Sequence, residues 1–353
     1  MTQSTTSIFY SLLSIPIALL LSTPACKKER IVEPLVVLTK TFTNPVFEGA
    51  DPWVVQQDST YYFTTTLGNR IELWKTKAIS QLRSVASTVV YFPTGSGPHN
   101  QNLWAPELHR LDDKWYLYYT AGSGPDSTQR LWVLENSDPD PGHGPWVDKG
   151  RVFSSTFDRW AIDGTVLDYQ GSRYFLWSGR PDLSVQNQNI YIAKMSNPWT
   201  LEGPVVLLSK PELSWEIQGG PVNEGPEVLR NPQGQVLVTY SASGCWTDDY
   251  TVGLLVLRTG GDPRQIADWT KKPQPVFVKK PQNSAYGPGH NAFFKSPDGT
   301  EDWIIYHANS KSGDGCGEKR NLRIQRFTWK ADGTPDFGEP AAVGTKLNVP
   351  SGE

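Results

Sequence analysis

The chain has 353 residues and a formal net charge of −3, with 14 Trp, 14 Tyr, 31 Gly and 28 Pro. It is long enough for two ordinary domains or one large repeat domain. Its basic residues are scattered and form no stripe, which argues against nucleic acid as a partner. Aromatic residues combined with frequent Gly and Pro are typical of many short strands joined by tight turns.

The N-terminus has the features of an export signal. Residues 8–21 are apolar, too few for an ordinary membrane span, and similar to the hydrophobic region of a secretory signal, although no Lys or Arg precedes Lys27. Ala25 before Cys26 resembles a bacterial lipoprotein signal, with Thr23 where such signals usually carry Leu. We expect cleavage before Cys26, lipidation of its thiol, and contact with a membrane only through that lipid. The expected location is the cell envelope, either periplasmic or anchored to the outer membrane; plain secretion is the alternative.

The rest of the chain divides into three parts. Residues 27–43 are expected to be a linker and a lead-in strand, residues 44–340 one repeat domain, and residues 341–353 a C-terminal tail. Five similar units fill the repeat domain, each with an opening motif, a turn and further short strands. Their openings are residues 50–55, 103–108, 162–167, 224–229 and 289–294.

The units predict an all-β fold, a five-bladed β-propeller. Aligning their openings on Asp51, Glu107, Asp163, Glu224 and His290 gives a repeat of about 60 residues with almost no helical periodicity. In such a fold the first strand of each blade lines the central channel, and the starts of these strands meet at one mouth. A two-sheet sandwich is the structural alternative, but it does not explain the regular spacing.

Three of the openings carry an acid just ahead of apolar residues, namely Asp51, Asp163 and Glu224. Carboxylates that converge on one axis are the groups needed to cleave a glycosidic bond. Each acid alone has an ordinary explanation as a turn residue or a partner of backbone amides. Their matching positions favour a function. Glu227 follows Glu224 by three residues along an extended strand and is expected to face the other side.

The opening motifs together resemble those of glycoside hydrolase family 43. They are Ala-Asp-Pro (50–52), Trp-Ala-Pro-Glu (104–107), Ile-Asp (162–163), Glu-Gly-Pro (224–226) and Gly-Pro-Gly-His-Asn (287–291), in the family's order. The resemblance implies a five-bladed propeller that hydrolyses arabinosyl or xylosyl linkages with inversion. Residues 240–243, 286–291 and 323–329 resemble the exo-acting α-1,5-L-arabinofuranosidase branch.

The resemblance also implies a role for each acid. Asp51 matches the general base that activates a water, and Glu224 matches the general acid that protonates the departing oxygen. Asp163 matches a third carboxylate that raises the pKa of the acid and orients it, as a nearby like charge does. Inverting enzymes keep acid and base roughly 6.5–9.5 Å apart so that a water fits between them.

Other residues are candidates for binding. Trp104 and Trp53 are candidate sugar platforms, with a place in the core as the alternative for each. His290 matches a family histidine on the axis beneath the sugar, where it holds a water or a calcium ion; a buried neutral histidine without metal is the alternative. Arg323 resembles a family arginine near the acid, or is a solvated charge. Glu107 is expected to be structural.

The remaining histidines and cysteines give weaker signals. His99, His109, His143 and His307 indicate no function. Cys245 and Cys316 lie in Gly-rich loops at similar places of adjacent units, where they form either a disulfide or two free thiols. They are too few for a zinc site.

The sequence therefore predicts an exo-acting hydrolase that releases L-arabinofuranose from arabinan or arabino-oligosaccharides of plant cell walls. No cofactor is expected to be required, and a calcium ion on the axis would be structural. A β-xylosidase, an endo-arabinanase, or removal of arabinose branches from xylan are alternatives with the same mechanism. The loops that decide among them, 95–102, 178–189 and 244–250, cannot be placed from sequence. Non-catalytic sugar-binding or protein-binding propellers are alternatives of another class, but both acid and base are present and no signature dipeptide recurs in each blade.

Overall fold

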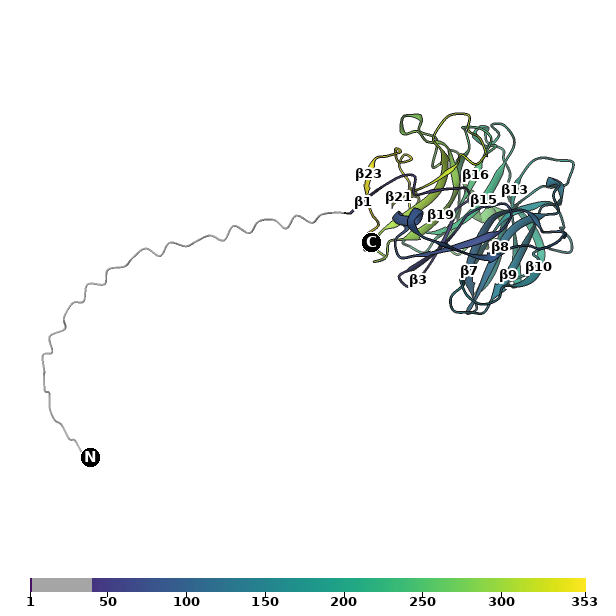
Figure 1. The fold of residues 1–353 in the computed structure, drawn as a ribbon. Helices are drawn as coiled ribbons and strands as arrows, with labels where there is room; N and C mark the ends of the chain where they lie inside the picture. The colour runs from purple at the N-terminus through teal and green to yellow at the C-terminus, as the bar shows by residue number, and fades with distance from the viewer. Residues whose placement is uncertain (2–39) are drawn as a thin grey trace. The chain divides into compact units, whose positions relative to one another are not determined.

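A computed structural model describes Met1 and residues 40–353 of the chain (Figure 1). The expected export signal with Cys26, and all of the linker before Lys40, lie outside the described residues. The helices are the short 3-10 turns η1 (Ile79–Ser84), η2 (Asp126–Thr128), η3 (Ser214–Glu216), η4 (Ile266–Asp268) and η5 (Pro281–Asn283). In this described part of the chain, none has the length or apolar character needed to cross a bilayer.

Five antiparallel sheets follow one another along the chain. The first two are β3 (Trp53–Gln57), β4 (Thr60–Thr64), β5 (Ile71–Thr76), β6 (Ser87–Tyr91), and β7 (Gln101–Leu111), β8 (Lys114–Gly122), β9 (Arg130–Asn136), β10 (Val147–Arg151). The next two are β11 (Ala161–Tyr169), β12 (Ser172–Gly179), β13 (Asn189–Asn197), β14 (Thr200–Ser209), and β15 (Asn223–Arg230), β16 (Val236–Ala242), β17 (Thr251–Leu257), β18 (Trp269–Lys271). The fifth contains β19 (Tyr286–Lys295), β20 (Asp302–Asn309) and β21 (Asn321–Trp329), which also pairs with β22 (Pro335–Asp336).

The sheets form a closed ring. Each first strand, β3, β7, β11, β15 and β19, contacts the first strand of the next sheet, and β19 contacts β3. This arrangement confirms the predicted five-bladed β-propeller, in which the first strands surround the central axis.

The N-terminal residues of the described domain complete the ring. Strand β2 (Phe47–Glu48) pairs with β21 as the outer strand of the fifth blade, and β1 (Thr41–Thr43) pairs with β23 (Lys346–Asn348). The segment 341–353, which we expected to be a tail, is therefore attached to the propeller through β23. The two ends of the domain are tied together by backbone hydrogen bonds, a feature that the sequence repeat did not reveal.

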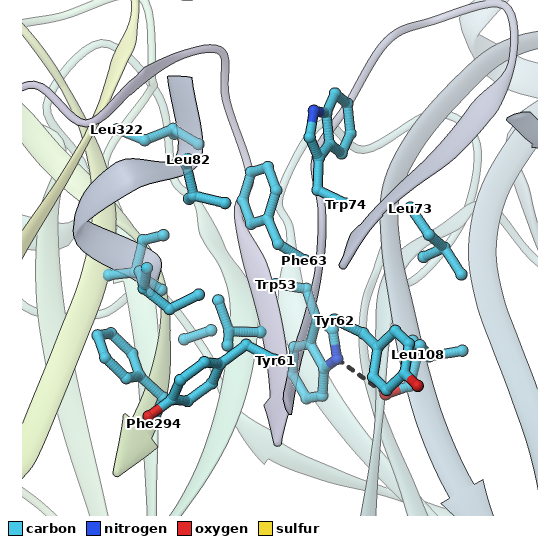
Figure 2. Close-up of a cluster of buried hydrophobic side chains, with 14 of the residues drawn as sticks. Trp53, Tyr61, Tyr62, Phe63, Leu73, Trp74, Leu82, Leu108, Phe294 and Leu322 are labelled. Carbon is cyan, nitrogen blue, oxygen red and sulfur yellow. Dashed lines mark hydrogen bonds between the residues drawn. The ribbon is translucent and has the colours of Figure 1, made fainter. Parts of the chain in front are cut away.

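The core lies between neighbouring blades. One buried cluster joins residues from the first, second and fifth blades, and Figure 2 shows part of it. Trp53 belongs to this cluster, and its indole N–H donates a hydrogen bond to the carbonyl of Leu108 at 2.9 Å. The prediction that Trp53 is a sugar platform is therefore wrong, since the alternation of side chains along β3 turns it into the core.

The first strands share an unusual backbone feature at the mouth of the channel. Each blade has a residue with positive φ at this point, within its first strand or, for Asp51, just before it: Asp51 (53°), Ala105 (41°), Asp163 (56°), Gly225 (53°) and His290 (44°). In four of the five blades the pairing register shifts beside this residue. These left-handed residues are the true equivalents among the blades. Our alignment of the openings is therefore wrong at Glu107, which follows its left-handed residue by two positions, and at Glu224, which precedes its own by one.

Candidate active site

A cavity of about 330 Å³ lies at the mouth of the channel, and we call it the outer cavity. Its lining residues are Asp51, Thr66, Trp104, Ile162, Asp163, Glu224, Cys245, Trp246, His290, Cys316 and Arg320. All three predicted catalytic acids are among them, together with Trp104 and His290. A larger surface groove beside residues 40–46 has no acidic side chain among its described lining residues, and another, lined by Asp112, Asp168 and Glu202, contains none of the three predicted acids. We therefore assign the chemistry to the outer cavity.

Asp51 is held in place by four side chains. The hydroxyl of Thr66 donates to Oδ2 at 2.7 Å, and the guanidinium of Arg320 lies 3.2 Å from Oδ1. The Nδ1 atoms of His290 and His307 each lie 3.3 Å from Oδ1, and Nδ1 of His307 also accepts the N–H of Asp51 at 3.2 Å. A nitrogen that accepts this bond carries no proton, so the hydrogen bonds assign His307 as neutral.

These neighbours keep Asp51 ionised. Burial alone would raise the pKa of Asp51, but His290, Arg320 and His307 outweigh it and hold that pKa well below its usual range. Burial also lowers the pKa of His290, and it lowers that of His307 to about 4. Both imidazoles are therefore neutral at pH 7 and lower the pKa of Asp51 by their charge only in acidic solution, where they are protonated. At pH 7 Arg320 is the permanent cation beside the carboxylate.

Asp163, on the third blade, and Glu224, on the fourth, lie close together. One oxygen of each and one ring nitrogen of His290 all lie within 4.8 Å of one another. The hydroxyl of Tyr250 donates to Oε1 of Glu224 at 2.8 Å. The N–H of Gly225 donates to Oδ2 of Asp163 at 2.9 Å. Each acid thus has a fixed orientation toward the cavity.

This pair of acids retains a proton near neutral pH. Burial raises the pKa of Glu224 to about 7, with the hydrogen bond from Tyr250 opposing the rise and the charge of Asp51 adding to it. Burial and the charges of Glu224 and Asp51 also raise the pKa of Asp163, while the N–H of Gly225 opposes that rise. Each charged form is stabilised by one donor, the N–H of Gly225 for Asp163 and the hydroxyl of Tyr250 for Glu224, and the two carboxyls share one proton. The cavity thus holds three carboxyl groups: an ionised Asp51, and the pair of Glu224 and Asp163, which shares one proton.

A family model described as "Glycosyl hydrolases family 43" matches residues 42–335. The chain belongs to this family. The observed fold and the three converging acids agree with the resemblance carried by the opening motifs.

Individual relatives in the family are arabinofuranosidases by name. The chain is 40% identical over 314 residues to an extracellular exo-alpha-(1->5)-L-arabinofuranosidase of Streptomyces avermitilis, covering 86% of this chain and 64% of the relative. It is 39% identical to a protein of the same name from Streptomyces chartreusis, covering 76% of this chain and 82% of the relative. The crystal structure of an alpha-L-arabinofuranosidase from Lactobacillus brevis superposes with a TM-score of 0.81 at 34% identity, covering 86% of this chain and 98% of that one. The chain thus spans slightly less than two thirds of the S. avermitilis relative.

Arg323, expected near the acid, lies elsewhere. It is fully buried, and its guanidinium donates to the carbonyls of Ser284 at 2.8 Å and Asn309 at 3.3 Å. The prediction that it contacts substrate is wrong, because β21 turns this side chain into the fifth blade. Arg320, in the loop just before β21, is the arginine that lines the outer cavity instead.

Sequence reasoning missed the four residues that contact Asp51 or Glu224 through hydrogen bonds: Thr66, Tyr250, His307 and Arg320. One of them had a usable signal. In an antiparallel pair the end of the second strand lies beside the start of the first, and His307 of β20 indeed pairs with Gly289 of β19. The other three lie outside the strands, where the repeat gives no positional information.

The two cysteines are bonded to each other. Cys245 and Cys316 form a disulfide with their Cα atoms 5.2 Å apart. Both line the outer cavity, so the bond joins a loop of the fourth blade to a loop of the fifth at the rim of the site.

A second, much smaller cavity of about 10 Å³ lies on the axis, and we call it the inner cavity. Its lining includes Asp51, Glu107, Glu227, His290 and Asn291. Oε2 of Glu227 and Oδ1 of Asn291 are buried and have no hydrogen-bond partner among residues 40–353. Calcium prefers such oxygen ligands, so the donors of the inner cavity fit the expected axial ion. Glu224 and Glu227 thus line different cavities.

Proposed function

We propose that the protein is an inverting, exo-acting glycoside hydrolase that releases L-arabinofuranose from arabinan or arabino-oligosaccharides of plant cell walls. The observation that carries the proposal is the convergence, in one cavity, of an ionised Asp51 and of Glu224, whose pKa burial raises to about 7. The names of the similar proteins support the choice of sugar. The limited volume of the outer cavity supports exo action, because an endo-acting enzyme needs a groove that extends on both sides of the bond.

The proposed reaction is a single displacement. Asp51 accepts a proton from a water while the oxygen of that water attacks the anomeric carbon. The bond between this carbon and the glycosidic oxygen breaks, and Glu224 donates its proton to the departing oxygen. Asp163 keeps the proton on Glu224 until the bond breaks, since two neighbouring buried carboxylates resist ionising together. Exchange with solvent then removes the proton from Asp51 and returns one to Glu224.

A time course followed by proton NMR on linear 1,5-arabinan tests the proposal. We expect L-arabinose as the first product, with the configuration at its anomeric carbon inverted. Asp51→Ala and Glu224→Ala should each lower kcat by about 10²- to 10⁴-fold, the usual contribution of a general acid or base. Glu212→Ala, which removes an exposed acid, is the control and should retain the full rate.

The alternatives predict other results. Internal oligosaccharides as first products would indicate an endo-arabinanase, and xylose from xylan oligosaccharides a xylosidase. Binding of arabinan without cleavage would indicate a non-catalytic propeller. Full activity of either Ala variant at Asp51 or Glu224 would refute the proposed mechanism.

We propose further that the chemistry requires no cofactor and that a calcium ion binds at the inner cavity in a structural role. Glu227, Asn291 and Glu107 would supply oxygen ligands, with His290 beside them. The ion would neutralise the buried carboxylates and fix the ends of the first strands. A chelator should lower the melting temperature, and elemental analysis of the purified protein should find calcium. Absence of both effects would refute this site.

We also propose that the protein is exported and anchored through a lipid on Cys26. The apolar residues 8–21 and the small residue before Cys26 support this, and two similar proteins are named extracellular. Mass spectrometry of the mature N-terminus should show a lipidated cysteine, and Cys26→Ser should release the protein from the membrane fraction. An unmodified N-terminus would instead indicate plain secretion.

A further inference from the structure

Trp246 is an exposed aromatic residue at the rim of the outer cavity. It lies between β16 and β17, it lines the cavity together with Glu224, and 55% of its surface is accessible to solvent. Most tryptophans of the described domain lie in the core, where burial of their large apolar surface stabilises the fold. An exposed indole contributes little to folding, so its position requires another explanation.

The indole lies against a surface made of glycines. A Cβ atom added at Gly219 would lie 2.8 Å from its Nε1 atom, and one added at Gly220 would lie 3.1 Å from Cζ2. A Cβ atom at Gly244 would overlap the ring outright. The three positions therefore lack side chains where the ring needs close approach to backbone. The indole is supported on this side and open toward solvent elsewhere.

Residues before and after Trp246 in the chain are also held in place by the neighbouring loop. The preceding residue, Cys245, is bonded to Cys316. Asp248 accepts the N–H of Gly313 at 2.9 Å, in the same loop as Cys316. The disulfide and this hydrogen bond join the loop that carries Trp246, before and after that residue, to the loop between β20 and β21. Holding the ring in one position before binding lowers the entropy lost when a ligand stacks on it.

The position of Trp246 near Glu224, the proposed general acid, indicates which part of the substrate it binds. Tyr250, which ends the loop that carries Trp246, donates to Oε1 of Glu224, so the loop borders the acid that protonates the departing oxygen. The sugar that departs must lie on the acid's side of the cleaved bond. Its apolar C–H face can stack on an aromatic ring.

We propose that Trp246 is the platform that binds the leaving-group sugar, and that the Cys245–Cys316 disulfide holds it in place. The inference rests on the proposed function. It assigns a binding site to the part of the substrate that remains after the terminal arabinose is removed. Trp246 is thus a specificity residue: it favours substrates in which a further sugar follows the cleaved bond.

The test compares two substrates that differ only in the leaving group, 1,5-linked arabinotriose and methyl α-L-arabinofuranoside. Trp246→Ala should raise KM for arabinotriose about three- to ten-fold, the range expected from losing one aromatic contact, and leave the kinetics on the methyl glycoside unchanged. Trp246→Phe should restore most of the affinity. Phe92→Ala removes an exposed aromatic residue between β6 and β7. It should change the kinetics on neither substrate.

The disulfide has its own measurement. The double variant Cys245→Ser with Cys316→Ser should raise KM for arabinotriose in the same direction, while its rate on the methyl glycoside shows that the site is intact. An equal loss on both substrates, or no change on arabinotriose in Trp246→Ala, would overturn the inference. If the unaltered protein cleaves neither substrate, both the proposed function and this inference fail.

Discussion

Tyr250 lowers the upper pH limit of the proposed activity, which burial of Glu224 raises. Glu224 must be protonated to act as the acid, and its pKa is about 7, so activity should fall as the pH rises through that value. The hydroxyl of Tyr250 stabilises the charged form of Glu224 through its hydrogen bond at 2.8 Å. Tyr250→Phe removes this donor, so the pKa of Glu224 should rise. The descending limb of kcat against pH should move upward by up to about one unit.

Tyr306→Phe is a matched control for this measurement. Tyr306 is also buried and donates to a side-chain oxygen, that of Gln325 at 2.9 Å, but its hydroxyl lies within the fifth blade. Its substitution should leave the descending limb where it is in the unaltered protein. A downward shift in Tyr250→Phe, or no shift, would show that this hydroxyl does not stabilise the charged acid.

At the scale of the element, the left-handed residue of each first strand explains how the acids reach the cavity. A residue with positive φ turns the chain at the mouth and points Asp51 and Asp163 inward, and at Asp163 it lies next to a register shift. Such a conformation costs a residue with a side chain roughly 1–2 kcal/mol. The fourth blade uses Gly225 there, and this places Glu224 one position earlier on the strand.

This geometry predicts opposite effects of two small substitutions on stability. In Gly225→Ala, the new Cβ atom would lie 3.3 Å from the ring of His290 in a conformation that disfavours it, so the free energy of unfolding should fall by about 1–2 kcal/mol. Ala105→Gly relieves the same strain in the second blade and should leave stability unchanged or raise it by up to about 1 kcal/mol. Thermal unfolding of both variants measures this. Equal losses would contradict the strain argument.

The left-handed residues and bulges of the first strands could not be predicted from the sequence. The five units and the convergence of Asp51, Asp163 and Glu224 follow from motifs that repeat along the chain. The repeat could not locate the bulges, because β11 and β15 are buried on both faces there and show no alternation of apolar and polar residues that a one-residue shift would interrupt. Arg320 and Trp246 lie on loops, whose course depends on contacts between blades distant in sequence, and Trp53 was misplaced because an aromatic residue near a motif suits the core equally well.

At the scale of the whole molecule, the ring depends on its closure. Asn44 lies just before β2, is 2% exposed, and pairs with the backbone of Ile324 in β21. Its side-chain N–H donates to the carbonyl of Ile324 at 2.8 Å, and its side-chain oxygen accepts the N–H of Ile324 at 3.0 Å. An amide side chain offers one donor group and one acceptor, so it reproduces the pairing of a strand residue. The side chain of Asn44 thus continues the pairing of the short β2 with β21, and we call this junction, where the ring closes, the seam.

Asn44→Ala should therefore destabilise the entire propeller. It leaves a buried N–H and a buried carbonyl of Ile324 unpaired, at a cost of about 2–4 kcal/mol in the free energy of unfolding. For a domain of this size we expect the melting temperature to fall by roughly 5–10 °C, with the rate on arabino-oligosaccharides at low temperature unchanged because Asn44 lies outside the outer cavity. Asn69→Ala is the control, since the Asn69 side chain accepts from Arg70 at an exposed site. Equal melting temperatures for the two variants would mean that the seam does not limit the stability of the ring.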